Sequence, residues 1–160
     1  MNLQVSTRTC VGFLVFQIMV WTGILWFHSR YEFAVSPLPS LPYRYYLIQK
    51  GVAIRPEAGK PTYISFRHPG YAHDLIKVIQ GQSGDIVSVQ GNTVYINDRA
   101  CGVIAPKDSQ GKELQPIHEQ RIPEDYYFVM GTHPHSFDSR YADFGLVHLS
   151  QIRGQAWPIA

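Results

Sequence analysis

The sequence predicts a mainly β protein, a small antiparallel folded sheet or barrel, carried by one N-terminal transmembrane helix. Residues 9–29 contain no Asp, Glu, Lys or Arg. From residue 45 onward, short runs of β-branched and aromatic residues alternate with turn residues, and no window there has a sustained helical period. Short strands at this spacing are typical of small barrels and folded sandwiches.

Length and charge limit the class of protein. The 160 residues suffice for one domain of ordinary size, and the net charge of +2 is spread along the chain. We therefore expect no nucleic-acid partner, which would need a clustered basic face. Cys10 and Cys101 are the only cysteines, so no zinc spacing exists. We expect Cys101 to be a small buried hydrophobe, with a free thiol or an intermolecular bridge as alternatives.

The apolar N-terminal segment is long enough to cross a bilayer. As a helix, its 18 to 21 residues would span roughly 27–31 Å, and Trp26 and Phe27 suit the membrane interface. A cleaved signal peptide and a buried core helix are the alternatives. Arg8 and Arg30 flank the segment and do not set its orientation. We predict a tip and anchor over residues 1–30 and a β-rich domain over residues 31–160.

The β-rich part divides into short runs. The expected strands cover residues 45–48, 62–66, 75–79, 86–89, 93–96, 126–130, 146–149 and 155–157. Residues 90–92, Gln-Gly-Asn, are a good hairpin turn between two of these strands. Residues 105–122 are polar and predict a surface excursion with no core of its own.

Residues 36–43, Ser-Pro-Leu-Pro-Ser-Leu-Pro-Tyr, follow directly after the apolar segment. Proline fixes its own φ and biases the preceding residue toward extended geometry, so we expect a stiff, extended lip at the membrane surface. Ser40 stands between two of these prolines. Its hydroxyl is a weak nucleophile that needs a base, and an ordinary loop serine is the alternative.

Lys77 lies in the middle of an apolar run, residues 75–79. Strand alternation places Leu75, Lys77 and Ile79 on one face, so the lysine has apolar neighbours. Burial would lower its pKa from about 10.4, and a drop of three units corresponds to about 4 kcal/mol. This free-energy cost of burial is reasonable if the neutral amine acts as a general base. The alternative is a lysine on an exposed face of the sheet. A phosphate loop at residues 81–85 lacks the helix start and the GK[ST] ending.

Residues 131–141 are the densest polar stretch. His133 and His135 suggest a metal site, but no third ligand is indicated, and we predict no metal and no cofactor. A Ser-His-Asp triad that uses Asp138 and His148 is also an open alternative.

Three segments in order resemble the conserved motifs of type I signal peptidases, the S26 serine/lysine peptidases. Residues 40–42, Ser-Leu-Pro, resemble the nucleophile motif Ser-Met-Pro, and residues 77–85 resemble K-R-V-x-G-x-P-G-D. Residues 131–145 resemble G-D-x-x-x-x-S-x-D-S-R. The Ser-Leu-Pro motif, the stretch around residues 133–141 and the short chain are most similar to the conjugative-transfer, TraF-type branch.

The resemblance implies a role for each matching residue. Ser40 would attack the scissile carbonyl, and a neutral Lys77 would take its proton and later donate one to the leaving amine. Ser136 would orient the Lys77 amine. Asp138 and Arg140 would form an ion pair that supports this loop. The backbone N–H of Ser40 would be one oxyanion donor.

The resemblance also implies where the substrate binds. The precursor would lie extended along Leu75 and Ile76 of the Lys77 strand and along Leu38 and Pro39 of the lip. Leu38 stands where many relatives have a serine or threonine that completes the oxyanion hole. The second oxyanion donor is therefore absent or comes from elsewhere.

The implied function is cleavage of signal peptides or propilin during assembly of a conjugative pilus. The implied partners are the precursor, the lipid bilayer and other conjugation or type IV secretion components. The resemblance places the protein in the inner membrane as a single-pass protein, with a cytoplasmic tip and the catalytic domain on the periplasmic side. A general secretory signal peptidase, a pilin cyclase with the same dyad and a non-catalytic module of a secretion assembly are the alternatives.

Overall fold

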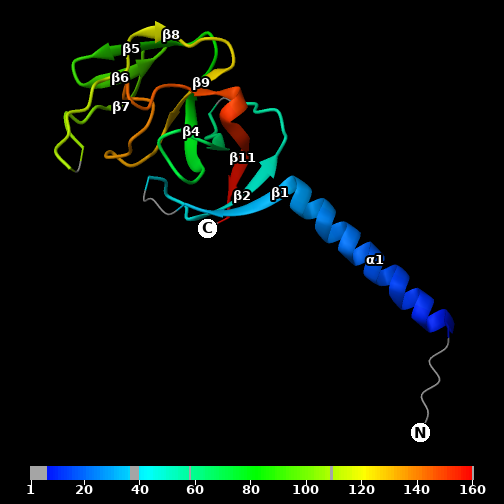
Figure 1. Ribbon diagram of the computed structural model, residues 1–160. Coiled ribbons are helices and arrows are strands. Elements are labelled where there is room, and N and C mark those ends of the chain that lie inside the picture. Colours follow the sequence, from blue (N-terminus) through cyan, green and yellow to red (C-terminus); the bar gives the residue numbers. More distant parts are fainter. Residues whose placement is uncertain (1–6, 37–39, 58, 109, 160) are drawn as a thin grey trace.

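The computed structural model describes residues 7–36, 40–57, 59–108 and 110–159. The chain begins with helix α1, Thr7–Arg30, whose 24 residues make it about 36 Å long. Figure 1 shows α1 projecting away from the β-rich part as a single rod. From Cys10 to Arg30 the helix is long and apolar enough to cross a membrane, and none of this span is buried inside the protein. These properties are consistent with membrane anchoring.

The rest of the described chain forms two antiparallel sheets. The larger contains β1 (Tyr31–Val35), β2 (Tyr45–Lys50), β3 (Tyr63–Phe66), β4 (Leu75–Gly81), β9 (Tyr126–Met130), β10 (Val147–His148) and β11 (Ile152–Pro158). Its strand order is β1-β2-β11-β3-β4-β9-β10, so the last strand pairs between β2 and β3. The expectation of a mainly β antiparallel fold with one N-terminal apolar helix is confirmed.

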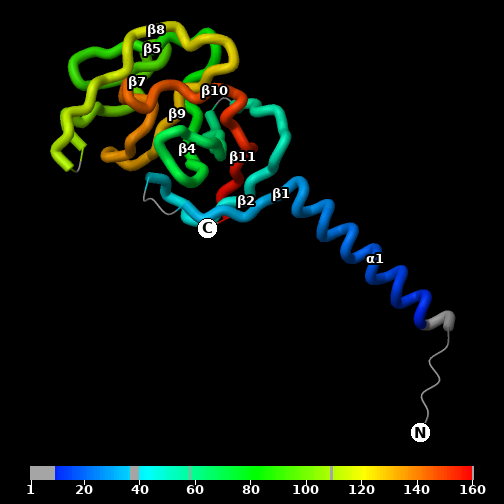
Figure 2. Tube along the Cα trace, viewed as in Figure 1, coloured from blue at the N-terminus to red at the C-terminus, as the bar shows by residue number. Residues whose placement is uncertain are grey.

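The second sheet has four strands. It contains β5 (Ile86–Gln90), β6 (Thr93–Ile96), β7 (Arg99–Val103) and β8 (Gln120–Arg121), in the order β7-β6-β5-β8. The predicted hairpin joins β5 to β6, with Gln90 opposite Thr93. In Figures 1 and 2 this sheet lies at the end of the β-rich part away from α1.

β4 is buried on both faces, which explains its apolar sequence. Ile76 and Val78 pack into one core cluster with residues of β2, β3 and β11. Leu75 and Ile79 pack into a second cluster on the other face. The alternation predicted for this strand is therefore observed, and it places Lys77 on the Leu75 face.

Of the predicted lip, residues 36–43, the structure describes Ser36 and residues 40–43, and these lie between β1 and β2. β1, a strand that the sequence did not predict, pairs with β2 from Tyr31–Gln49 to Val35–Tyr45. The Ser36 N–H then donates to the Arg44 carbonyl at 2.9 Å, which closes the base of the loop. Residues 40–42 turn within this loop. Because β1 is mostly exposed, its sequence has no alternation that would predict a strand.

The excursion over residues 105–122 is tied to the core, contrary to expectation. Ile117 and Ile122 are buried in a third cluster, and the Ile117 N–H donates to the Arg140 carbonyl at 2.9 Å. The excursion also contributes β8, which pairs with β5. Two isolated isoleucines in a polar stretch give no periodic pattern. Only their contacts with residues distant in the sequence show that they belong to the core.

Cys101 is half-buried and packs against this third cluster. Both Cys101 and Cys10 are free cysteines. The expectation of a buried small hydrophobe therefore holds for the packing of Cys101 but not for full burial.

Candidate active site

Ser40 is held in place through its backbone. The Ser40 carbonyl accepts the N–H of Thr132 at 2.8 Å and that of His133 at 3.3 Å. The Thr132 hydroxyl adds a third bond to the same oxygen at 3.3 Å. The residue is 7% exposed, and the next residue, Leu41, is buried in the core. Ser40 is thus fixed against the loop that follows β9.

Lys77 is buried in β4, with only 2% of the residue exposed. Its Nζ donates to Ser136 Oγ at 2.5 Å. Burial lowers the pKa of the amine to about 8, the nearby Asp138 carboxylate opposes this shift, and Arg140 adds to it. A larger share of the Lys77 amine is therefore neutral at pH 7 than of an exposed lysine amine.

Gly131 permits the close approach of the segments that carry Ser40 and Ser136. A Cβ at this position would overlap Ser136 Oγ and lie 2.7 Å from the Ser40 carbonyl oxygen. The Gly131 N–H donates to Asp138 Oδ2 at 3.0 Å. Any side chain here would therefore displace one of these groups.

Asp138 and Arg140 form a buried, bidentate ion pair. Arg140 Nε lies 2.8 Å from Asp138 Oδ1, and Nη2 lies 3.0 Å from Oδ2. Arg140 also donates to the carbonyls of Ser136 at 2.8 Å and Val103 at 2.7 Å. Because one guanidinium links the Ser136 loop to β7, the ion pair holds this loop in place. The polar groups of the two side chains are already used in these hydrogen bonds.

Ser40 and Lys77 line two neighbouring cavities. The first, of about 210 Å³, lies between residues 32–36 and residues 73–77, and we call it the upstream groove. The second, of about 260 Å³, is bounded by the loop after β9 and includes Ser136, and we call it the downstream cavity. Ser40, Lys77 and Leu75 line both, so the predicted nucleophile and base stand where the two cavities meet.

Among the described residues, the upstream groove has strand edges without a partner strand. β4 pairs with β9 only from Val78 onward, where Val78 lies opposite Met130. Leu75, Ile76 and Lys77 pair only with β3 among the described strands, and β1 ends the sheet on its own side. An extended peptide can therefore bind as an added strand here. The predicted contact residues Leu75 and Ile76 line the groove, whereas Leu38 and Pro39 lie outside the described residues.

The alternative chemistries are not assembled. The His148 ring bonds to Ser150 at 2.7 Å and caps a short 3-10 helix, Leu149–Gln151, while the Asp138 carboxylate is occupied by Arg140. Across the described ranges, no group of three or more His, Cys, Asp or Glu side chains could hold a metal ion. In the loop at residues 81–85, the Gln82 N–H donates to the Asp85 carboxylate, as in an ordinary turn.

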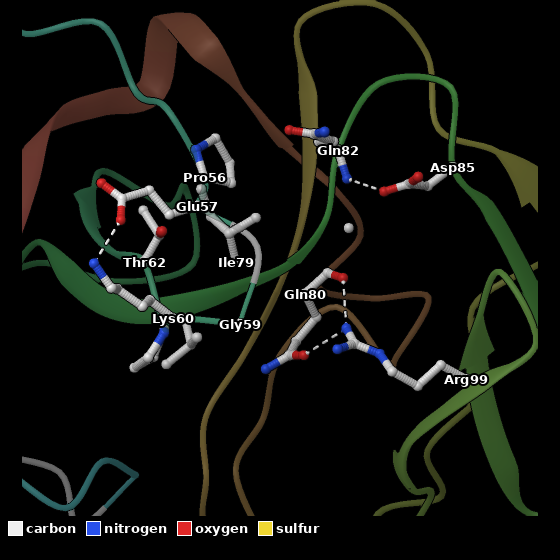
Figure 3. Close-up of a pocket in the computed structure, with 13 residues that line it drawn as sticks. Pro56, Glu57, Gly59, Lys60, Thr62, Ile79, Gln80, Gln82, Asp85 and Arg99 are labelled. Atoms are coloured by element: carbon white, nitrogen blue, oxygen red, sulfur yellow. Dashed lines mark hydrogen bonds and ion pairs between the residues drawn. The ribbon is translucent and has the colours of Figure 1, made fainter.

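A separate polar cavity of about 460 Å³ lies between residues 56–57 and 59–62 on one side and Val78 to Gly81 of β4 on the other (Figure 3). None of the predicted site residues lines it. Figure 3 shows its charged groups paired locally, with Lys60 bonded to Glu57 at 2.9 Å and Arg99 to the Gln80 side chain at 3.3 Å. The charged groups of this cavity are therefore paired with their neighbours and not with the predicted site.

Some residues around Ser40 were not found by the sequence analysis. Thr132 contacts the Ser40 carbonyl, and Tyr71 and Phe137 are walls of the downstream cavity. Thr132 could have been found, because it lies inside the third motif. Tyr71 could not, because it belongs to a loop between β3 and β4 and only tertiary structure brings it to Ser40.

A β-rich domain with a terminal membrane-length helix and a buried lysine beside a serine has the features of an anchored serine peptidase. The family model for signal peptidase, peptidase S26, matches residues 6–159, and the chain belongs to this family. Membership implies serine peptidase activity in general, with precursor proteins as substrates.

Comparisons with individual proteins are more distant. A crystal structure of a signal peptidase I from Enterococcus faecalis V583 has 23% sequence identity and a TM-score of 0.42. The match covers 68% of this chain and 100% of that chain. No curated protein matches the chain.

Proposed function

We propose that the protein is a membrane-anchored serine endopeptidase in which Ser40 and Lys77 form the catalytic dyad. The observation that carries the proposal is the environment of Lys77, which combines burial, a hydrogen bond and a lowered pKa. Lys77 is 2% exposed and lines the same two cavities as Ser40, and its amine bonds to Ser136 and has a pKa lowered to about 8. A buried, partly neutral amine beside a serine is what a general base requires.

The reaction begins when Ser40 Oγ attacks the scissile carbonyl carbon while Lys77 takes the hydroxyl proton. The backbone N–H of Ser40 stabilises the oxyanion. The protonated Lys77 then donates its proton to the leaving amine as the C–N bond breaks, and an acyl-enzyme remains. A water molecule, deprotonated by Lys77, hydrolyses the ester and restores Ser40.

Ser136, Asp138 and Arg140 are positioning residues in this scheme. The Ser136 hydroxyl accepts the Lys77 bond at 2.5 Å and so fixes the direction of the amine. Arg140 holds the Ser136 carbonyl, and Asp138 neutralises the buried guanidinium. Their function is to limit the orientations of Lys77.

The precursor binds in the upstream groove as an added strand, with small side chains before the scissile bond. Two features support this mode: the free edges of β1 and Leu75–Lys77, and a cavity of only about 210 Å³. Leu38 and Pro39 complete the contact surface in the proposal. Because β1 starts one residue after α1 ends, the groove lies within about 17 Å of the helix end.

We place residues 1–30 as cytoplasmic tip and anchor, and residues 31–160 on the periplasmic face of the inner membrane. A cleavage site that emerges from the bilayer would then meet the groove directly. The substrate is a signal peptide or a propilin of a conjugative pilus. The resemblance of residues 40–42 and 133–141 to the conjugative-transfer branch favours the pilin.

The test is cleavage of a candidate propilin by the full chain in detergent, followed by mass spectrometry. The wild type should yield the two fragments, and Ser40→Ala should yield none. Ser88→Ala in β5 removes a serine away from both cavities and should behave as the wild type. Cleavage by Ser40→Ala at the wild-type rate would overturn the dyad. A product lighter than the hydrolysed fragment by one water would identify cyclisation instead.

A further inference from the structure

We infer that the downstream cavity binds the residue directly after the scissile bond and selects an aromatic side chain there. The inference rests on the proposed endopeptidase function and goes beyond it by naming a specificity determinant. The cavity has about 260 Å³, and its walls beside Ser40 and Lys77 include Tyr71, Phe137 and the two imidazoles of His133 and His135.

The position of the Lys77 amine assigns this cavity to the leaving-amine side. Lys77 Nζ bonds to Ser136 Oγ, and Ser136 lines the downstream cavity but not the upstream groove. The proton that Lys77 carries must reach the leaving nitrogen, so that nitrogen departs on the Ser136 side. The substrate segment before the scissile bond, which becomes the acyl group, binds at the free strand edges of the upstream groove. The peptide then continues past Ser40 into the downstream cavity.

The two aromatic walls share one rigid support. The Phe137 ring packs edge-on against Phe144, with centroids 5.6 Å apart. The Tyr71 ring packs against His68 at 5.5 Å, and His68 in turn stacks on Phe144 at 4.4 Å. The His68 Nε2 also bonds to the Phe144 carbonyl at 3.2 Å, which fixes this imidazole. Because both walls rest on Phe144, the cavity is preorganised to hold a planar ring.

The polar lining disfavours a basic side chain. Among the described residues that line the cavity, none is Asp or Glu, while Lys77, His133 and His135 are all present. A lysine or arginine after the scissile bond would therefore meet only basic or neutral groups. An aromatic ring meets the faces and edges of Tyr71 and Phe137 instead.

A larger cavity adjoins the downstream cavity. It has about 600 Å³, is also lined by Tyr71, His135 and Phe137, and extends to Lys107 and Lys112 of the excursion. We assign this neighbouring cavity to the substrate residues that follow the first one after the scissile bond.

The experiment compares peptide substrates that are identical before the scissile bond and carry Phe, Ala or Lys directly after it. With the full-length wild type in detergent, kcat/KM for Phe should exceed that for Ala by roughly twofold to tenfold, the factor for one aromatic pair. The Lys peptide should be cleaved more slowly than the Ala peptide. Tyr71→Ala should remove the preference for Phe, and Tyr71→Phe should retain it.

The matched control is Tyr95→Ala, which removes a tyrosine from β6 in the other sheet and should keep the wild-type preference. Binding gives a second measurement that needs no turnover. A peptide that begins with Phe, matching the downstream product, should bind Ser40→Ala in titration calorimetry and should bind the Ser40→Ala, Tyr71→Ala double variant at least threefold more weakly.

The outcomes separate the two proposals. Equal cleavage of the three peptides by the wild type, with Ser40→Ala inactive, would overturn the aromatic subsite and leave the endopeptidase standing. No cleavage of any peptide, together with Tyr71-dependent binding of the Phe peptide, would overturn the endopeptidase and support the cavity as an aromatic binding site. Equal binding of the Phe peptide by both variants would overturn the subsite directly.

Discussion

Replacement of Lys77 by methionine should abolish cleavage and change how the stability of the protein depends on pH. Methionine has nearly the length of lysine without its charge, so the substitution removes the base while it keeps most of the packing. The Ser136 hydroxyl loses its donor, which costs about 1–3 kcal/mol. This loss is the same at every pH used here, because the serine hydroxyl does not titrate in that range. The change of the unfolding free energy with pH therefore reports only the charge of Lys77.

The magnitude follows from the pKa of Lys77, which burial lowers from 10.5 to about 8. Below pH 8 the amine is protonated in both states, so folding buries the charge at a cost of about 3 kcal/mol. Between pH 8 and 10.5 the unfolded chain still holds a proton that the folded chain has lost. The stability of the wild type should therefore rise by about 3 kcal/mol relative to Lys77→Met across this range.

The assay is urea unfolding of both proteins in detergent at pH 7, 8, 9 and 10.5, with the difference in unfolding free energy as the readout. Tyrosines titrate in the same range in both proteins, so their contribution cancels. Lys60→Met, at an exposed lysine that bonds to Glu57, is the control and should show no such rise. The cleavage rate of the wild type should increase about tenfold per pH unit below pH 8 and level off above it.

A constant difference between the wild type and Lys77→Met from pH 7 to 10.5 would refute the reasoning. It would mean that Lys77 keeps an ordinary pKa in the folded protein. The site would then contain no neutral amine near pH 8, and the proposed base would be lost with it.

Three further substitutions test the surroundings of the dyad. Gly131→Ala should lower kcat at least a hundredfold, because its Cβ overlaps Ser136 Oγ, and the same substitution at exposed Gly12 of α1 should leave kcat unchanged. Arg140→Met should lower the unfolding free energy by about 3–5 kcal/mol, because it leaves the Asp138 carboxylate buried without its counter-charge; an unchanged urea midpoint would contradict this. Ser136→Ala should slow cleavage in single-turnover assays and shift the pH–rate midpoint, whereas a purely structural role would leave that midpoint in place.

The sequence was most informative where a structure depends on local pattern. A run of about 21 residues without charge can form only a few structures, and α1 is one of them. The alternating runs became β2, β3, β4, β5, β6 and β9, because one or both faces of each strand enter the core. β1 was missed because most of its side chains remain exposed, and its only strong constraint is the backbone ladder to β2.

The candidate site was predicted through three short motifs and not through residue patterns alone. Taken bare, the residues also allowed a triad with His148 and Asp138 or a metal site at His133 and His135. The structure does not assemble the triad, because the Asp138 carboxylate pairs with Arg140 and the His148 ring bonds to Ser150. Nothing local in the sequence shows those pairings, since each depends on how a loop folds back.

The sequence by itself determined the long apolar N-terminal helix, the strand-rich class and the placement of Lys77 between apolar neighbours, because these properties depend on composition and on a two-residue period. Only the tertiary structure decided that both faces of β4 are buried and that the Lys77 amine meets Ser136, 59 residues away. It also decided that Ser40 lies in a hairpin loop where two cavities meet. The physical reason is that burial, desolvation and cavity walls are properties of packing between distant segments, which no local pattern encodes.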